Sequence, residues 1–338
     1  MEILRNISLK EYNTFGIAAT AKFFAEITTI DDLIQVLGQE SYTDRFIISG
    51  GSNILITKDI DALVLHINIK GITVAKEDAD HVVLKVNAGE NWHNLVLWTL
   101  DQDYGGLQNL SLIPGNCGTA PIQNIGAYGV ELKDCFVGCD AIHIKSKELR
   151  SFTKEDCKFG YRDSFFKNDG KGKYIITTIY LKLTKRNHVL NTSYGAISSE
   201  LKKQNIIIPN IKDVSNAVVA IRQEKLPDPK ELGNSGSFFK NPVVTKEVFN
   251  TLHGAYSDIP SYRISEDVYK IPAGWLIEQC GFKGKRYKDA GVHSKQALVL
   301  VNYGSATGAD ILDLAHNIQK SVLEKFNIRI LPEVNIIK

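Results

Sequence analysis

The chain is poor in cysteine and has no long apolar run. Its 338 residues include five cysteines, at positions 117, 135, 139, 157 and 280. This odd number and wide spacing argue against a disulfide scaffold. No stretch approaches the roughly 18 apolar residues of a membrane-spanning helix, and charged residues at positions 2, 5, 10 and 11 interrupt any secretory leader. We therefore expect a reduced protein of the cytoplasm, without a membrane segment.

The chain also lacks an excess of charge of one sign. Its 40 lysines and arginines nearly balance 38 acidic residues, for a formal net charge of +2 with histidine neutral. That balance gives no electrostatic reason to expect binding to nucleic acid or to an anionic membrane. Hydrophobic residues make up 43% of the chain and charged residues 23%, which argues against disorder and indicates an ordinary core. At roughly 150 residues per domain, the length predicts two or three domains.

Several cofactor and metal motifs are missing. The sequence has no G-x-G-x-x-G and no G-x-x-x-x-G-K-[ST], so neither a Rossmann nor a P-loop nucleotide site is indicated. Cys135, Cys139 and His143 are spaced four apart, which leaves a metal site conceivable, but reduced structural thiols explain them more simply. We expect no metal.

Helical and strand patterns alternate along the chain, which predicts a mixed α and β protein. Strands are expected over 23–27, 46–49, 54–57, 62–67, 82–88, 174–183 and 297–301, with one or two more over 328–337, broken at Pro332. Helices are expected over 31–37, 92–100, 214–221, 272–280 and 311–326. Thr29 is the expected N-cap of the first helix, and Pro272 is expected in the first turn of the fourth. Residues 226–229, L-P-D-P, form a candidate linker.

Two glycine-bearing segments could bring backbone close to a ligand. Gly50-Gly51-Ser52-Asn53 lies between two expected strands, and its N–H groups could form an anion-binding nest, although a hairpin turn explains the same residues. Residues 113–129 contain four glycines and two prolines in 17 residues. So long an irregular segment in a compact domain is usually functional or disordered, and its apolar residues disfavour disorder. A purely structural loop stays an alternative.

Three polar residues could take part in chemistry, and each also has an ordinary explanation. Arg162, in Y-R-D-S, could clamp a carboxylate or phosphate, or form a surface ion pair. Ser237, in a glycine-rich turn before two phenylalanines, could donate a proton, although no G-x-S-x-G nucleophile elbow is present. Glu333 follows a proline near the C-terminus and indicates little alone.

Taken in order, these segments resemble one family. From about Asn13 to Glu333 the chain is similar to the UDP-N-acetylenolpyruvoylglucosamine reductases through an ordered series of motifs: G-G-S-N, I-P-G-x-x-G-x-x-P-I-Q-N-I-G-A-Y-G, F-G-Y-R-D-S, K-L-P-D-P, G-S-F-F-K-N-P, A-G-W-L-I-E-Q-C-G and L-P-E-V. The length, and Tyr194 in S-Y-G, resemble the longer branch of the family, in which a tyrosine loop closes over the substrate.

The resemblance implies an α+β fold. It consists of a two-lobed FAD-binding domain of the vanillyl-alcohol-oxidase (PCMH) type and a C-terminal α/β substrate-binding domain. The implied boundaries are residues 1–70 with the strand 331–338 for the first lobe, 71–225 for the second lobe, and 226–330 for the substrate domain. The final strand is thus expected to return to the first lobe.

The resemblance also implies an activity, that of UDP-N-acetylmuramate dehydrogenase in peptidoglycan precursor synthesis. Noncovalent FAD would pass a hydride from NADPH to C3 of the enolpyruvyl group of UDP-N-acetylglucosamine enolpyruvate, and a proton would go to C2, giving UDP-N-acetylmuramate. A monomer is expected. Another flavin-dependent oxidase or dehydrogenase on the same fold stays an alternative.

Residue by residue, the motifs imply three groups of site residues. In the catalytic group, Ser237 would donate the proton, while Arg162 and Glu333 would polarise the substrate carboxylate. The cofactor-binding group would be Gly50, Gly51, Ser52, Asn53, Ile54, Pro114, Gly115, Gly118, Thr119, Ile122, Gly126 and Arg222. The substrate-binding group would be Tyr161, Tyr194, Lys225, Asn241, Tyr262 and Gln296.

Overall fold

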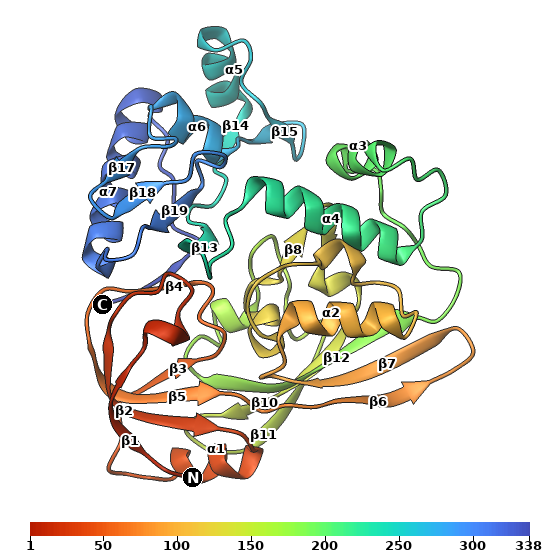
Figure 1. Cartoon of the computed structure of the whole chain (residues 1–338), viewed down its shortest axis with the longest axis vertical. Coiled ribbons are helices and arrows are strands. Elements are labelled where there is room, and N and C mark those ends of the chain that lie inside the picture. Colours follow the sequence, from red (N-terminus) through yellow and green to blue (C-terminus); the bar gives the residue numbers. More distant parts are fainter. The chain divides into compact units, whose positions relative to one another are not determined.

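The computed structural model describes all 338 residues and divides them into two compact units (Figure 1). The first comprises Met1–Ile7, Ala21–Gly50 and Ile60–Glu224, and the second comprises Ser8–Thr20, Gly51–Asp59 and Lys225–Lys338. Two short N-terminal segments therefore belong to the same unit as the C-terminal third of the chain. The predicted mixture of helices and strands is confirmed, whereas the predicted division into two FAD-binding lobes and a substrate domain stays a prediction.

The first unit begins with a small sheet whose strands lie in the order β1-β2-β5-β3. Its members are β1 (Leu4–Ser8), β2 (Thr20–Ile27), β3 (Arg45–Ile48) and β5 (Ile60–Ile67), of which β2, β5 and β3 run parallel. Helix α1 (Ile30–Leu37) begins as predicted, because the Thr29 side chain accepts a hydrogen bond from the Asp32 N–H. Its buried face, Leu33, Val36 and Leu37, packs on the sheet.

A second sheet of the first unit has five antiparallel strands in the order β11-β10-β12-β7-β6. These are β6 (Ile72–Glu77), β7 (His81–Asn87), β10 (Phe136–His143), β11 (Leu149–Thr153) and β12 (Tyr174–Thr184). Helix α2 (Trp92–Asp101) lies along this sheet (Figure 1). Its Trp92, Leu95 and Val96 belong to the same core as the buried residues of β7 and β12. The Trp92 indole N–H donates to the Leu110 carbonyl at 3.0 Å, so the helix also fixes the segment that follows it.

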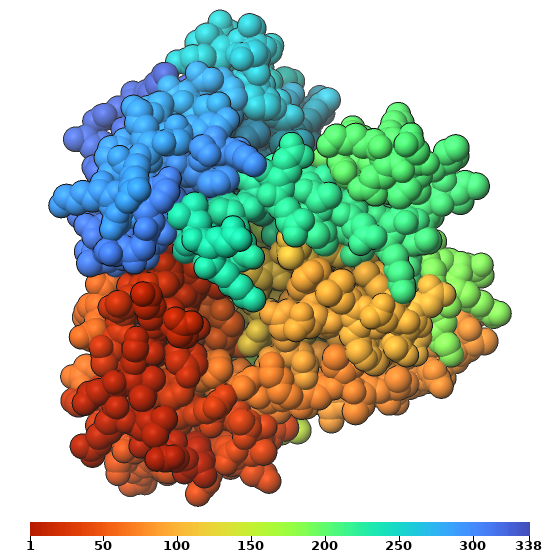
Figure 2. All heavy atoms as spheres, in the orientation of Figure 1, coloured from red at the N-terminus to blue at the C-terminus, as the bar shows by residue number.

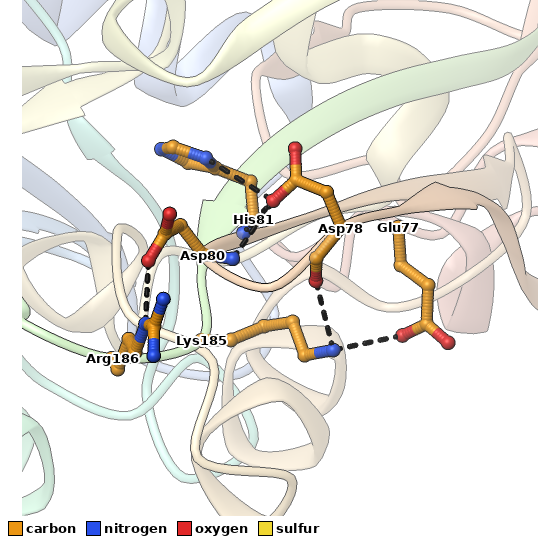
Figure 3. A network of polar contacts seen from close by, with 6 residues as sticks. All are labelled: Glu77, Asp78, Asp80, His81, Lys185 and Arg186. Atoms are coloured by element: carbon orange, nitrogen blue, oxygen red, sulfur yellow. Dashed lines mark hydrogen bonds and ion pairs between the residues drawn. The ribbon is translucent and has the colours of Figure 1, made fainter.

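Charged side chains join the tip of the β6–β7 hairpin to the end of β12 (Figure 3). The Arg186 Nε lies 2.5 Å from an Asp80 carboxylate oxygen, and the Lys185 Nζ lies 3.1 Å from Glu77. The hydrogen bond from Arg186 and the positive charge of its guanidinium lower the pKa of the Asp80 carboxyl. Because these groups are largely exposed, water screens them and the network adds little to stability.

The rest of the first unit consists of short elements and two helices. They are η2 (Gln108–Leu110), η3 (Cys117–Gln123), β8 (Gly126–Ala127), β9 (Val130–Glu131), η4 (Leu132–Asp134), η5 (Phe165–Lys167), α3 (Gly195–Lys203) and α4 (Ile211–Lys225), the last residue of which begins the second unit. The predicted irregular segment thus contains a 3-10 helix and a short strand. Helices α3 and α4 share an apolar cluster of Ile197, Leu201, Ala217, Val218 and Ile221. The space-filling view shows α3, in green, at the surface of this unit (Figure 2).

The second unit is built on a four-stranded sheet in the order β13-β19-β18-β17. Its elements are η1 (Lys10–Tyr12), β4 (Ile54–Ile56), β13 (Gly233–Ser237), β14 (Val243–Thr245), α5 (Lys246–Ala255), β15 (Tyr262–Arg263), β16 (Val268–Lys270), α6 (Ala273–Gln279), β17 (Arg286–Tyr287), β18 (Ala290–Val292), β19 (Val299–Asn302), α7 (Gly308–Phe326) and β20 (Asn335–Ile337). Thr307 and Asp310 form a capping box at the start of α7. The C-terminal strand β20 pairs in parallel with β4, and both strands belong to the second unit, while the predicted return of the final strand to a first FAD-binding lobe stays a prediction.

The structure decides three local points. The hairpin turn that was the alternative for residues 50–53 is wrong, because β3 and β4 belong to different sheets. Of the one or two strands predicted over 328–337, one is present, Asn335–Ile337, and Pro332, which has no N–H for a ladder, makes a single bridge to Phe239. Pro272 is the N-cap of α6, outside its first turn. No helix is both long enough and apolar enough to span a membrane.

Candidate functional site

The G-G-S-N loop, residues 50–53, is shaped by close backbone contacts. A Cβ on Gly50 would lie 2.8 Å from the Gly115 Cα, so within the first unit this residue packs directly on the second glycine-bearing segment. The neighbouring Asn116 amide donates to the Ser49 hydroxyl at 3.1 Å. In the second unit, Gly51 has φ +58° and a Cβ there would lie 2.0 Å from the Tyr12 carbonyl oxygen. Both positions therefore require glycine.

The segment from Pro114 to Gly126 lies against the end of β7. A Cβ on Gly118 would lie 2.4 Å from the Ala88 Cβ, and the Gly118 N–H donates to the Ala88 carbonyl at 2.9 Å. The Thr119 N–H and hydroxyl both donate to the Asn116 carbonyl, at 3.1 and 2.8 Å. The N–H groups of Gly118 and Thr119 are therefore used within the protein, and a ligand would meet other atoms of these residues. Ile122 is half-buried beside them.

Arg162 is held in an unusual backbone conformation. Its φ is +52°, in the left-handed region that non-glycine residues rarely adopt. Gly160 and Asp163 bridge across this turn, and the Arg162 Nη2 donates to the Gly126 carbonyl at 2.6 Å. The preceding Tyr161 is 47% exposed, and its ring centroid lies 5.6 Å from the Arg162 guanidinium carbon. The turn thus fixes a guanidinium beside the end of the glycine-bearing segment.

Arg222, on α4, lies near Arg162 in the same unit. Its Nε donates to the Leu112 carbonyl at 3.1 Å, and its guanidinium is hydrogen-bonded to the Tyr128 hydroxyl. Burial lowers the pKa of Arg222, and the positive charge of Arg162 lowers it further. Tyr128 opposes this shift, and no carboxylate contributes to it. The guanidinium groups of Arg222 and Arg162 interact electrostatically, and guanidinium donors of this kind bind phosphate or carboxylate groups.

Ser237 and Glu333 lie on neighbouring segments of the second unit. Ser237 ends β13 opposite Val299, and the Glu333 N–H donates to the carbonyl of Phe238, the next residue after Ser237, at 2.8 Å. The Asn53 amide donates to the Glu333 carbonyl at 3.4 Å. The Ile54 carbonyl accepts from the Ser235 hydroxyl at 3.3 Å. This unit therefore holds the predicted proton donor, the predicted acid and three of the four residues of the G-G-S-N loop.

The predicted substrate residues of the second unit make separate local contacts. The Asn241 Oδ1 accepts from the Ala273 N–H at 2.9 Å, where it binds the free N-terminal end of α6. The Gln296 Oε1 accepts from the Leu298 N–H at 3.3 Å. Tyr262 is 51% exposed, with the Lys270 Nζ 5.4 Å from its ring centroid. Lys225 is exposed at the end of α4.

Tyr128 is a residue that sequence reasoning missed. It stood in the quoted motif G-A-Y-G, but its role was not predicted. Its ring lies 5.4 Å from that of Tyr194, which precedes α3 and is 44% exposed. The signal that could have found it is a bulky residue before glycine where a tight turn is due. His93 was missed as well: its Nδ1 accepts from the Leu112 N–H at 3.0 Å, and burial and Arg222 lower its pKa.

The residues once considered for a metal do not form a site. Cys135 and Cys139 are buried free thiols, and Cys139 contacts Cys157 instead of His143. No group of three or more His, Cys, Asp or Glu side chains is arranged to hold a metal ion.

Comparison with known proteins connects these features to a family. Residues 228–337 match the UDP-N-acetylenolpyruvoylglucosamine reductase C-terminal domain, and residues 21–150 match an FAD binding domain. The chain is 58% identical over 337 residues to the UDP-N-acetylenolpyruvoylglucosamine reductase of Flavobacterium johnsoniae, and the match covers 100% of both chains. The chain belongs to the UDP-N-acetylenolpyruvoylglucosamine reductase family.

Other members of the UDP-N-acetylenolpyruvoylglucosamine reductase family agree with this assignment. The enzyme of Pseudomonas aeruginosa is 44% identical over 338 residues, covering 99% of each chain. The crystal structure of the reductase from Thermus caldophilus covers 100% of both chains with a TM-score of 0.71 at 21% identity, which concerns the fold alone. The predicted fold, an FAD-binding domain joined to the C-terminal domain of this reductase family, is therefore confirmed, and the chain is a flavoprotein oxidoreductase.

Proposed function

We propose that the chain catalyses the NADPH-dependent reduction of UDP-N-acetylglucosamine enolpyruvate to UDP-N-acetylmuramate, a step of peptidoglycan precursor synthesis in the cytoplasm. Full-length identity of 58% to a curated reductase supports this activity. The observation that carries the proposed chemistry is the main-chain bond from the Glu333 N–H to the Phe238 carbonyl, because it brings the backbone of Glu333 next to the residue that follows Ser237. NADPH and the sugar nucleotide are proposed to bind in turn, which gives ping-pong kinetics.

The residues around the glycine-bearing segments suit noncovalent FAD, which when bound supplies hydride transfer between NADPH and the substrate. Gly50 and Gly51 keep side-chain atoms away where two backbone segments meet, and the Arg162–Arg222 pair offers donors to an anion. We assign FAD binding to Gly50, Gly51, Ser52, Asn53, Ile54, Pro114, Gly115, Gly118, Thr119, Ile122, Gly126 and Arg222.

Three residues are assigned to the reaction itself. Hydride addition at C3 leaves negative charge at C2, next to the substrate carboxylate. Arg162 would neutralise that carboxylate, and Glu333, in its protonated form, would stabilise the enolic intermediate by donating a hydrogen bond. The Ser237 hydroxyl would then protonate C2, a transfer that is feasible because a carbanion-like intermediate is a strong base.

Substrate binding is assigned to Tyr161, Tyr194, Lys225, Asn241, Tyr262 and Gln296. Lys225 and Tyr194 suit the diphosphate, as a point charge and a hydroxyl donor. Tyr194 is 44% exposed at the start of α3, which supports a role for this segment as the tyrosine loop of the longer branch of the family. The bond to the Ala273 N–H fixes the orientation of the Asn241 amide, so its Nδ2 has a defined direction.

An anaerobic titration followed by absorbance tests the activity. The purified protein is expected to be yellow, to bleach with NADPH, and to regain its colour when UDP-N-acetylglucosamine enolpyruvate is added. Recovery with oxygen only would favour the alternative, an oxidase on the same fold. A folded protein that stays colourless after FAD is added would refute the cofactor and the reductase assignment together.

The role of Ser237 is tested by comparing the two half-reactions in Ser237→Ala. Flavin reduction by NADPH should stay close to the parent rate. Reoxidation by the enolpyruvyl substrate should slow by about 10²- to 10⁴-fold, the usual contribution of a positioned proton donor. Ser235→Ala is the matched control, since that hydroxyl bonds to the Ile54 carbonyl, and it should leave both rates near those of the parent. Equal slowing of both half-reactions in Ser237→Ala would contradict the proton-donor role.

A further inference from the structure

Tyr128 occupies a turn position that its side chain disfavours. Strands β8 and β9 pair antiparallel, and Tyr128 and Gly129 are the two residues between them. Their φ angles are +51° and +82°. Positive φ at both central residues is what a type I′ turn requires, and asparagine or glycine normally takes the first place. A bulky residue there is an outlier, and such outliers gather at functional sites.

The side chain of Tyr128 has two distinct contacts within the first unit. The Arg222 guanidinium is hydrogen-bonded to its hydroxyl. Its ring meets Tyr194 edge to face, with centroids 5.4 Å apart and planes at 87°, and it packs on the apolar cluster shared by α3 and α4. An asparagine would relieve the turn but would supply neither contact. The side chain, and not the turn, therefore explains why a tyrosine is present.

We propose that Tyr128 is a positioning residue whose hydroxyl holds the Arg222 guanidinium and whose ring seats Tyr194 at the start of α3. It couples the segment that carries Tyr194 to the arginine pair, and it need touch neither flavin nor sugar nucleotide. This role of Tyr128 rests on the proposed function, because Arg222 is assigned there to FAD and Tyr194 to the substrate.

Two substitutions separate the contacts. Tyr128→Phe keeps the ring and the same left-handed backbone, and removes only the hydroxyl. Tyr128→Leu keeps a bulky side chain and removes both the hydroxyl and the aromatic edge. Tyr180→Phe is the matched control, because it removes a phenol hydroxyl that is bonded to a charged group, Asp140, at 2.8 Å on the β-sheet. If Tyr128→Leu fails to fold, Tyr128→Asn replaces it, since asparagine suits this turn.

The first measurement is amide hydrogen exchange over residues 192–203 in the protein as purified. Tyr128→Leu should exchange about 2- to 12-fold faster there, the change expected when an edge-to-face aromatic pair is lost. Tyr128→Phe and Tyr180→Phe should match the parent. Unchanged exchange in Tyr128→Leu would overturn the seating role, and this arm does not depend on the flavin or on the activity.

The second measurement is the FAD dissociation constant, from titration into flavin-stripped protein. Tyr128→Phe should bind FAD about tenfold more weakly, because a hydrogen bond to a charged group is lost, while Tyr180→Phe should bind it like the parent. FAD affinity equal to that of the parent in Tyr128→Phe would overturn the hydroxyl role. If the parent itself does not bind FAD, the proposed function fails, whereas the exchange measurement still decides the seating of Tyr194.

Discussion

The backbone contact at Gly51 leads to a prediction that the structure makes quantitative. Replacing Gly51 with alanine has two costs: a left-handed φ of +58°, and a Cβ 2.0 Å from the Tyr12 carbonyl oxygen. Gly16 separates the two, because its φ is +65° and a Cβ there meets nothing within 4 Å. Both glycines belong to the second unit. The pair Gly51→Ala and Gly16→Ala therefore isolates the cost of the clash.

The magnitude follows from the distances. Gly16→Ala adds only the strain of a left-handed alanine, about 1–2 kcal/mol, which Gly51→Ala shares. Ordinary contact begins near 3.4 Å, so the Gly51 Cβ and the Tyr12 carbonyl must separate by about 1.4 Å. The obstacle is backbone, and the Thr14 N–H bond to the Gly51 carbonyl at 3.1 Å holds the two segments together. Overpacking of this kind costs about 1–3 kcal/mol beyond the shared strain.

The assay is urea unfolding of both flavin-free variants and the parent, so that ligand binding does not add to the measured stability. The unfolding free energy of Gly51→Ala should lie about 1–3 kcal/mol below that of Gly16→Ala. FAD affinity, measured separately, should fall in Gly51→Ala and stay close to the parent value in Gly16→Ala. Equal stability of the two variants would refute the reasoning, since it would mean that the loop yields without cost.

Two further predictions concern titratable groups. A thiol reagent should modify one cysteine rapidly in the native protein and all five after unfolding. Cys280 alone is partly exposed, whereas burial raises the pKa of the Cys135 thiol to about 12 and that of the Cys117 thiol further. Rapid modification that persists in Cys280→Ser would contradict this prediction. Burial, with the Asp140 bond second, raises the pKa of Tyr180 to about 12 from its ordinary 10.0. A group whose pKa is raised in the folded state contributes stability at pH values below its pKa in the unfolded state, so this contribution should be lost as the pH rises from about 10 to about 12. The unfolding free energy of Tyr180→Phe should lack that part of the pH dependence.

Local signals in the sequence were sufficient for five of the seven α-helices, whereas α3 and α5 were missed. Thr29 before a periodic apolar pattern correctly predicted α1, and the apolar spacing from Ile311 to Phe326 correctly predicted α7. Both cases depend on contacts three or four residues apart, which the sequence displays directly. The absence of a strand over 328–334 has the opposite cause. Ile328, Ile330 and Val334 are buried as a strand pattern predicts, but the backbone there pairs only at the single bridge between Pro332 and Phe239.

The assignment of residues 8–20 and 51–59 to the C-terminal unit could not be predicted from composition. The pairing of β4 with β20 joins residues about 280 positions apart, and a strand-like tripeptide such as Ile54–Ile56 carries no information about its partner. The site motifs were found because several occur in a fixed order along the chain. These motifs were sufficient to predict roles for Arg162, Ser237 and Glu333. The left-handed backbone of Arg162 and Tyr128 could not be predicted from the sequence, because tertiary contacts set such a conformation at a bulky residue.

The distribution of backbone strain is itself an argument about where function lies. Among non-glycine residues with positive φ, those other than asparagine and aspartate are three exposed lysines at 147, 158 and 288, and three further residues, Leu112, Tyr128 and Arg162. All three of these residues interact with one side chain, Arg222. The Leu112 carbonyl accepts a hydrogen bond from the Arg222 Nε, the Tyr128 hydroxyl is bonded to its guanidinium, and the positive charge of Arg162 lowers its pKa. Each left-handed bulky residue costs about 1–3 kcal/mol. Stability alone would favour asparagine or glycine in those turns, so the contacts that these three residues make with the half-buried Arg222 support the proposal that Arg222 binds an anion.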